Sequence, residues 1–258
     1  MKNTVARPES AILIQHSLVL DQVILPEHPA DWPCPLSLTL GLKEFLLLEG
    51  LDLAAAQQLL SLAATLQLAV QGRVLLWGQD VAAAARDDLY QRRRRLAYLA
   101  PGQVLLHRLT VLENITLPGR YFQQRSISEI IKDNSELLAT LGLTPYFSCY
   151  PTELPADIYF RALWARAFLK DPELILAAPG AGATTPENNR LILMLLRDYR
   201  EQRRGAVLLT GPGLEAFPSL ADRCFRLESR GLIEIRVPGQ TAPSLTPYLL
   251  FWSSVKQR

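Results

Sequence analysis

The chain has 258 residues, of which 49% are hydrophobic, and its formal net charge is +2. A chain of this kind can bury a substantial core, and its nearly balanced charge gives no general indication of nucleic-acid binding. Its three widely spaced cysteines favour a reducing compartment over a disulfide framework or a zinc site. We find no signal-peptide core and no apolar run of about 18 residues, so we expect no membrane-spanning segment.

The first part of the chain predicts a β-rich layer that is followed by alternating strands and helices. Residues 11–25 are apolar and partly β-branched, which is consistent with one or two strands. Residues 44–48 are typical of a buried strand. Gly50 then turns the chain into a helix that is predicted over residues 53–68, and we expect another strand at 72–77.

A helix is predicted over residues 81–95, and it ends in four consecutive arginines, Arg92–Arg95. A basic cluster of this kind can bind nucleic acid or lipid headgroups. The alternative is a solvated helix end, where positive charge is favourable to the helix dipole. Residues 126–142 also have helical periodicity, with Gly142 as a plausible C-cap.

The segment from Tyr150 to Pro179 is the most informative part of the sequence. Two prolines mark a loop, a helix follows over residues 157–169, and the apolar run 174–177 is typical of a buried strand. A helix at 186–201 and a strand at 205–210 continue the alternation. This order predicts an α/β fold with a mainly parallel sheet.

The same segment resembles the ABC-transporter ATPases, in which a signature loop leads to a helix ending Ala-Arg-Ala and a strand ending Asp-Glu-Pro. The matching residues are Ala165-Arg166-Ala167, Asp171-Pro172-Glu173 and Pro179, and Leu109–Ile115 matches the family's Leu-Thr-Val-x-Glu-Asn. The resemblance covers about residues 40–235. It implies a single ABC-ATPase-like domain over residues 1–258, with an N-terminal β layer. It also implies an inserted helical subdomain at about 85–165 and a tail at about 236–258.

The phosphate-binding loop of this family has the pattern G-x-x-x-x-G-K-[ST], which wraps phosphates and supplies a lysine and a magnesium ligand. Gly50 matches the first glycine, whereas Ala55, Ala56 and Gln57 fall at the second glycine, the lysine and the hydroxyl. Because alanine is a strong helix former, residues 54–56 predict a helix that extends backwards into the nucleotide's space.

Other functional positions of the family are also replaced. Pro101 falls at the Q-loop glutamine, and Gln103 is a candidate substitute two residues later. The replaced positions, from the phosphate loop to the signature, the acidic pair and the switch histidine, are Ala56, Gln57, Pro101, Pro155, Ala156, Asp157, Ala177, Ala178 and Gly211. From this pattern we predict that the chain is not an enzyme and that it needs no cofactor or metal.

The resemblance also implies partners, because the family's Q-loop region receives a helix of a membrane permease. The candidate docking residues are Leu99, Pro101, Leu105, Leu106, Leu109 and Val111. The implied location is the cytoplasmic face of the inner membrane, with a homodimer or pairing with another nucleotide-binding subunit, and no nucleic acid. The stretches around Arg92–Arg95 and Glu153 look most similar to ATPase subunits of Mla/Mce-type lipid transporters.

We therefore predict a non-catalytic subunit of an ABC-type transport assembly, with a lipid as the transported substrate. Two alternatives are a soluble regulatory or scaffold protein that reuses the fold, and a divergent ATPase. An apolar surface near residues 99–118 favours the transport assembly, and a polar one favours the scaffold. In the tail, Tyr248, Phe251 and Trp252 form either a docking cluster or part of the domain's own packing.

Overall fold

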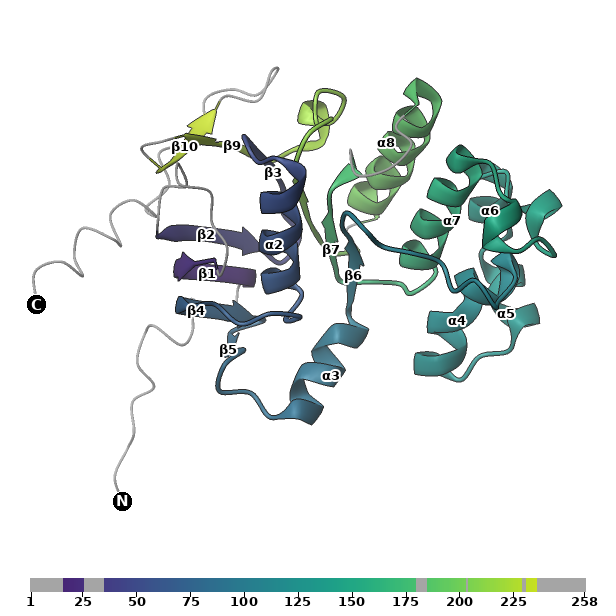
Figure 1. Ribbon diagram of the computed structural model, residues 1–258, viewed down its shortest axis with the longest axis horizontal. Helices are drawn as coiled ribbons and strands as arrows, with labels where there is room; N and C mark the ends of the chain where they lie inside the picture. The colour runs from purple at the N-terminus through teal and green to yellow at the C-terminus, as the bar shows by residue number, and fades with distance from the viewer. Residues whose placement is uncertain (1–15, 26–34, 180–184, 203, 229–230, 236–258) are drawn as a thin grey trace, which may run out of the picture.

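The computed structural model describes residues 16–25, 35–179, 185–202, 204–228 and 231–235. Its first layer is an antiparallel sheet with the strand order β2-β1-β4-β5 (Figure 1). The strands of this sheet are β1 (His16–Ile24), β2 (Leu36–Gly41), β4 (Gln71–Leu76) and β5 (Gln79–Asp80). The predicted N-terminal β layer is therefore present, although residues 11–15 lie outside the described ranges.

The second sheet has six strands in the order β10-β9-β3-β8-β7-β6. All neighbouring strands run parallel except the pair β9 and β10. The strands are β3 (Phe45–Glu49), β6 (Leu96–Leu99), β7 (Leu174–Ala177), β8 (Ala206–Thr210), β9 (Arg223–Glu228) and β10 (Gly231–Ile235). The predicted α/β fold with a mainly parallel sheet is confirmed, and β6 belongs to this sheet although it lies within the predicted 85–165 range.

The central strands are apolar on both faces because the sheet is covered on both sides. In β3, Leu46 and Leu48 pack with the antiparallel layer and helix α2 (Leu53–Ala63), whereas Phe45 and Leu47 pack with the helices opposite. Helix α2 lies between the two sheets (Figure 1). This explains the continuous apolar run of residues 45–48, because a half-exposed strand would alternate.

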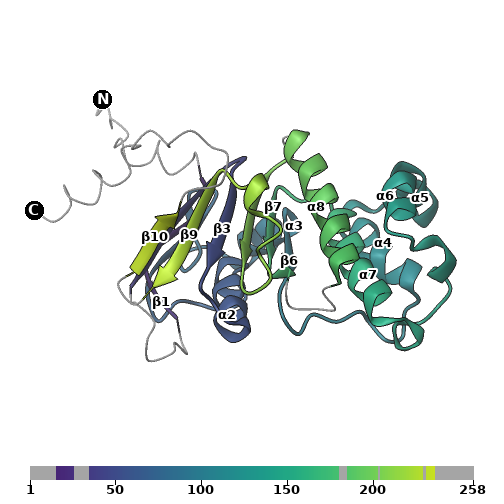
Figure 2. The same cartoon turned by 90° about the horizontal axis from the view of Figure 1, so that it is seen from above.

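The remaining helices are α3 (Arg86–Arg94), α4 (Val111–Gln123), α5 (Ile127–Asp133), α6 (Ser135–Thr140), α7 (Ala156–Phe168) and α8 (Pro186–Glu201). Seen from above, α8 lies next to the sheet, and the outer helices α4, α5, α6 and α7 lie beyond it, with α5 and α6 farthest out (Figure 2). Within the described ranges, none of the helices is long and apolar enough to cross a bilayer.

Three predicted helices differ from the observed ones. Helix α2 ends at Ala63 rather than residue 68, because Thr65 takes a left-handed φ of 62°. Helix α3 begins at Arg86 rather than residue 81, because the Val81 N–H donates to the Val74 carbonyl and continues the strand contact. The predicted helix over 126–142 is two helices that break at Asn134.

The four consecutive arginines each contact another part of the fold. Their partners are the Leu76 carbonyl for Arg92, Thr65 for Arg93, the Phe122 carbonyl for Arg94 and the Glu173 carboxylate for Arg95. Arg95 also stacks on the Trp77 ring, 4.1 Å from its centroid. The tract therefore fastens α3 to its neighbours, which favours the structural alternative over headgroup or nucleic-acid binding.

Candidate functional site

The start of helix α2 follows a turn that only glycine can make. Gly50 has a φ of 88°, and a Cβ at this position would lie 2.5 Å from the carbonyl oxygen of Leu227. Any larger residue would therefore force β9 away from β3. Gly50, which matches the first glycine of the phosphate loop, is thus required by the packing of β9 against this turn.

Asp52 caps the helix after this turn. Its Oδ1 accepts the Ala55 N–H at 2.8 Å, and its carbonyl oxygen accepts the Ala56 N–H at 2.9 Å. The first helical residue is Leu53, which is where the sequence predicted the helix to begin. A helix N-terminus attracts anions through its free N–H groups, and here a carboxylate of the chain itself lies at that end.

Three small residues meet where the sheet ends beside α2. Ala56 is fully buried and Ala178 is 4% exposed. A Cβ at Gly211 would lie 3.3 Å from the Cβ of Ala56 and 3.7 Å from that of Ala178. Two other predicted site residues do not lie at this contact. Gln57 is exposed, and Ala177 is buried on the opposite face of the sheet.

The structure brings together Ala56, Ala178 and Gly211, the residues that the resemblance assigns to the family's lysine, acidic and switch-histidine positions. Ala56, Ala178 and Gly211 carry neither a charged side chain nor one that can ligate a metal. Residues 180–184 lie outside the described ranges.

The signature positions lie at the first turn of α7. Pro155 is the N-cap residue, Ala156 begins the helix, and Asp157 carries a carboxylate 3.5 Å from Arg161. Arg161 is 9% exposed and also bonds the first turn of α8, through Asn188 at 2.8 Å and Glu187 at 2.9 Å. These residues therefore join two helices in the present structure.

The predicted docking residues lie in and beside residues 101–110, which we call the docking loop. Leu99, Leu105 and Val111 are buried, so a partner cannot contact their side chains directly. Pro101 and Leu109 are half-buried. Leu106 is 47% exposed, and the sequence analysis missed its neighbour Val104, which is 55% exposed. Val104, Leu105 and Leu106 are all apolar, so the sequence held no signal that would tell the exposed ones from the buried one.

Two side chains of α7 hold the docking loop. The Leu105 N–H donates to the Tyr159 hydroxyl oxygen at 2.8 Å, and the Arg166 guanidinium donates to the Val104 carbonyl at 3.0 Å. Burial lowers the pKa of Arg166 from its ordinary value. These bonds satisfy backbone groups that no strand or helix pairs, so they fix the path of the loop.

Asn114 lies beneath the loop and is fully buried. Its Oδ1 accepts the Leu106 N–H at 2.7 Å. Its Nδ2 lies 3.0 Å from each of three carbonyl oxygens, those of Leu106, Leu109 and Thr110. In the sequence, Asn114 is part of the matching stretch Leu109–Ile115, which by itself indicates no role for it.

The loop passes into α4 through a capping box. Thr110 accepts the Glu113 N–H, and the Glu113 carboxylate accepts the Thr110 N–H at 2.8 Å. Hydrogen bonds from the backbone and hydroxyl of Thr110 lower the pKa of Glu113. The Val111 N–H donates to the Cys149 carbonyl, next to Tyr150, which is 47% exposed and was also missed.

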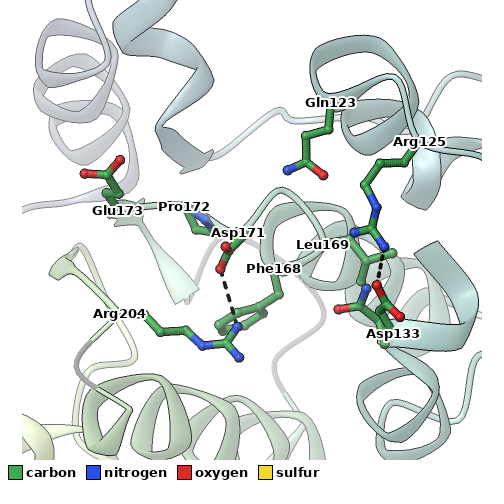
Figure 3. A pocket seen from close by; sticks show the side chains of 10 residues that line it. Gln123, Arg125, Asp133, Phe168, Leu169, Asp171, Pro172, Glu173 and Arg204 are labelled. Atoms are coloured by element: carbon green, nitrogen blue, oxygen red, sulfur yellow. Dashed lines mark hydrogen bonds and ion pairs between the residues drawn. The ribbon is translucent and has the colours of Figure 1, made fainter. Parts of the chain in front are cut away.

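A polar pocket of about 500 Å³ lies at the opposite end of β7 (Figure 3). Arg204 and Asp171 lie 3.5 Å apart at its edge, and Arg125 pairs with Asp133. Because these charges are matched within the chain, the pocket presents no unpaired group that indicates a ligand.

The sheet order, the helix that follows β3 and the outer helices define the fold of ATP-binding-cassette ATPases. A bacterial ABC transporter cassette named MJ0796 matches with a TM-score of 0.73 and 22% identity, over 86% of this chain and all of that one. The cbiO1 protein of Clostridium perfringens, titled as part of the ABC transporter complex cbiONQ, matches with a TM-score of 0.66 and 14% identity, over 85% of this chain and 87% of that one.

Sequence comparison points to the same class of protein. The chain is 30% identical over 199 residues to the methionine import ATP-binding protein MetN of Rhizobium johnstonii, covering 77% of this chain and 55% of that protein. It is 27% identical over 208 residues to MetN 2 of Pseudomonas aeruginosa, covering 81% of this chain and 62% of that protein. The chain spans just over half the length of these curated relatives, and no protein-family model matches it. The chain is thus similar in sequence to these import ATP-binding proteins and has the fold of ABC-transporter ATPases.

These relatives correct one prediction. We predicted that the chain is not an enzyme, and this is contradicted by relatives that are named ATP-binding proteins. Ala56, Ala178 and Gly211 lie at one place in the fold, and their identities alone do not determine the activity of the chain.

Proposed function

We propose that the chain is the ABC-ATPase-type subunit of a membrane transport assembly and that it binds a permease subunit through the docking loop. The fold and the similarity to importer subunits support this assignment. The observation that carries it is the exposure of Val104 and Leu106 on a loop whose backbone is held by side chains. Apolar groups presented from a fixed backbone are typical of protein–protein interfaces.

The surroundings of these two side chains add to the proposal. His107 and Arg108 are exposed on the same loop, and the exposed Tyr150 follows the residue that bonds Val111. An apolar centre with polar and aromatic neighbours has the composition of an interface core and its rim. This composition favours a permease partner over the alternative of a soluble scaffold, for which we expected a polar surface.

The partner places the chain at the cytoplasmic face of the membrane, and the proposal includes a second nucleotide-binding-type subunit in the same assembly. The substrate is a separate question, for which the Mla/Mce resemblance predicts a lipid, whereas the curated relatives import methionine. The identity of the permease that binds will distinguish these two substrate classes.

The experiment is co-expression of the chain with integral-membrane permease subunits of ABC type from the same genome, followed by detergent extraction and affinity purification. We expect the wild-type chain to be retained and Val104→Asp to lose at least about tenfold in retention, because a charge would be desolvated in the interface. Leu68→Asp is the matched control, since Leu68 is 62% exposed but lies between α2 and β4. Equal retention of both variants, or no retention of the wild type, would reject the proposal.

A further inference from the structure

The buried side-chain amide of Asn114 holds the docking loop. Its hydrogen bonds are made with backbone groups of the loop and not with a neighbouring side chain. Asn114 contacts Leu106 on both sides, at the N–H and at the carbonyl oxygen. Two bonds to one residue fix its backbone orientation, so the direction in which the Leu106 side chain leaves the loop is also fixed. The next turn of α4 does not share this arrangement, because Thr116 bonds only within the helix.

The neighbouring residue locks the loop from the other direction. The Leu105 side chain is fully buried in the core shared by the outer helices, and its N–H is bonded to Tyr159. The exposed Val104 and Leu106 lie on either side of the buried Leu105, so the packing of Leu105 anchors the segment that presents them. The packing of Leu105 and the hydrogen bonds of Asn114 therefore both fix the direction in which the Leu106 side chain points.

We propose that Asn114, assisted by Tyr159, is a positioning residue that pre-orders Leu106 for contact with the permease. This inference rests on the proposed function of the docking loop. A loop that is ordered before binding loses less conformational freedom when the complex forms. Without Asn114 the partner must order the loop itself, so binding weakens although Asn114 does not touch the partner.

The test compares three variants of the full chain. Asn114→Leu removes all the bonds to the loop at similar volume, and Tyr159→Phe removes only the hydroxyl that accepts the Leu105 N–H. Thr116→Val is the matched control, because Thr116 is also fully buried in α4 but bonds only its own helix. Amide hydrogen exchange is measured on the free chain, and retention is measured with the co-expressed membrane subunits.

We expect Asn114→Leu to speed exchange of the Leu106 amide at least about tenfold and to weaken retention by a similar factor. Tyr159→Phe should do the same at Leu105 to a smaller extent, and Thr116→Val should change neither readout. Unchanged loop exchange in both loop variants would overturn the inference, as would a loosened loop with unchanged retention. If Asn114→Leu does not fold, Tyr159→Phe decides. Loss of wild-type retention would instead reject the proposed function, and exchange alone would then show whether Asn114 orders the loop.

Discussion

Gly211 lies directly against Ala56, and a Cβ at Gly211 would be 3.3 Å from the Ala56 Cβ. Gly211 also has a φ of 92°, a conformation that residues with a Cβ rarely adopt. The contact closes the space between the ends of β7 and β8 and helix α2. Small side chains at this place are therefore required by the packing as it stands.

Gly211→Ala is expected to lower the free energy of unfolding by about 1–3 kcal/mol, through backbone strain and crowding of Ala56. Gly102→Ala is a matched control, because Gly102 has a φ of 77° but no atom within 4 Å of an added Cβ. Urea unfolding of both variants separates crowding from strain. Equal losses in the two variants would show that the contact with Ala56 is unimportant.

Asp52→Ala should lower stability by about 1 kcal/mol, because the Ala55 N–H then loses its capping acceptor. Asp52→Ser should restore most of this stability, since a serine hydroxyl caps a helix in the same way. Thermal unfolding of the two variants checks the prediction. A serine variant as unstable as the alanine variant would mean that Asp52 acts through something other than its cap.

Lys170 is expected to give the protein a pH-dependent stability. Burial lowers the pKa of its ammonium group from 10.5 to about 8, while the carbonyl oxygens of Arg93 and Leu96 accept its hydrogen bonds. Between these two pH values the unfolded chain binds more protons than the folded one, so this lysine's contribution to the unfolding free energy rises with pH.

Lys170→Met removes that contribution, so the stability of the wild type relative to this variant should increase as the pH rises from about 8 to 10.5. Urea unfolding at the two ends of this window measures the change. The exposed Lys132, changed to Met, is the control and should show no such trend. A difference that is flat or falls with pH would contradict the prediction.

The arginine tract should prove to be structural. Arg93→Gln loses both bonds to Thr65 and should cost about 1–2 kcal/mol of stability. Binding to vesicles that contain anionic lipid should be the same for the variant and the wild type, as judged by co-sedimentation. Vesicle binding by the wild type that disappears in the variant would restore the headgroup alternative.

Several strands could be predicted because each is a short apolar run bounded by turns, as in residues 45–48 and 174–177, whereas β6 and α4 were not predicted. The start of α2 was also predictable, since three alanines and Asp52 favour a capped helix. The ends of helices were not predictable. The Val81 contact with Val74 and the left-handed Thr65 both depend on neighbours that the local pattern does not show.

The docking surface was predicted only in part, for a similar reason. Leu105 and Leu106 are both leucines, and periodicity alone did not show which of them is buried. The role of Asn114 depends on the loop folding back over α4, which spacing along the chain does not show. The ATP-related prediction was wrong because it inferred the activity of the whole chain from residue types at a few positions.

Photo-cross-linking from Leu106 tests the central claim most directly. A benzoylphenylalanine residue at position 106 should cross-link to a co-expressed permease subunit in intact membranes, because this side chain lies in the proposed interface. The same residue at position 68 should give no such product. Cross-linking from 68 but not 106, or from neither position in an assembly that co-purifies, would contradict the account.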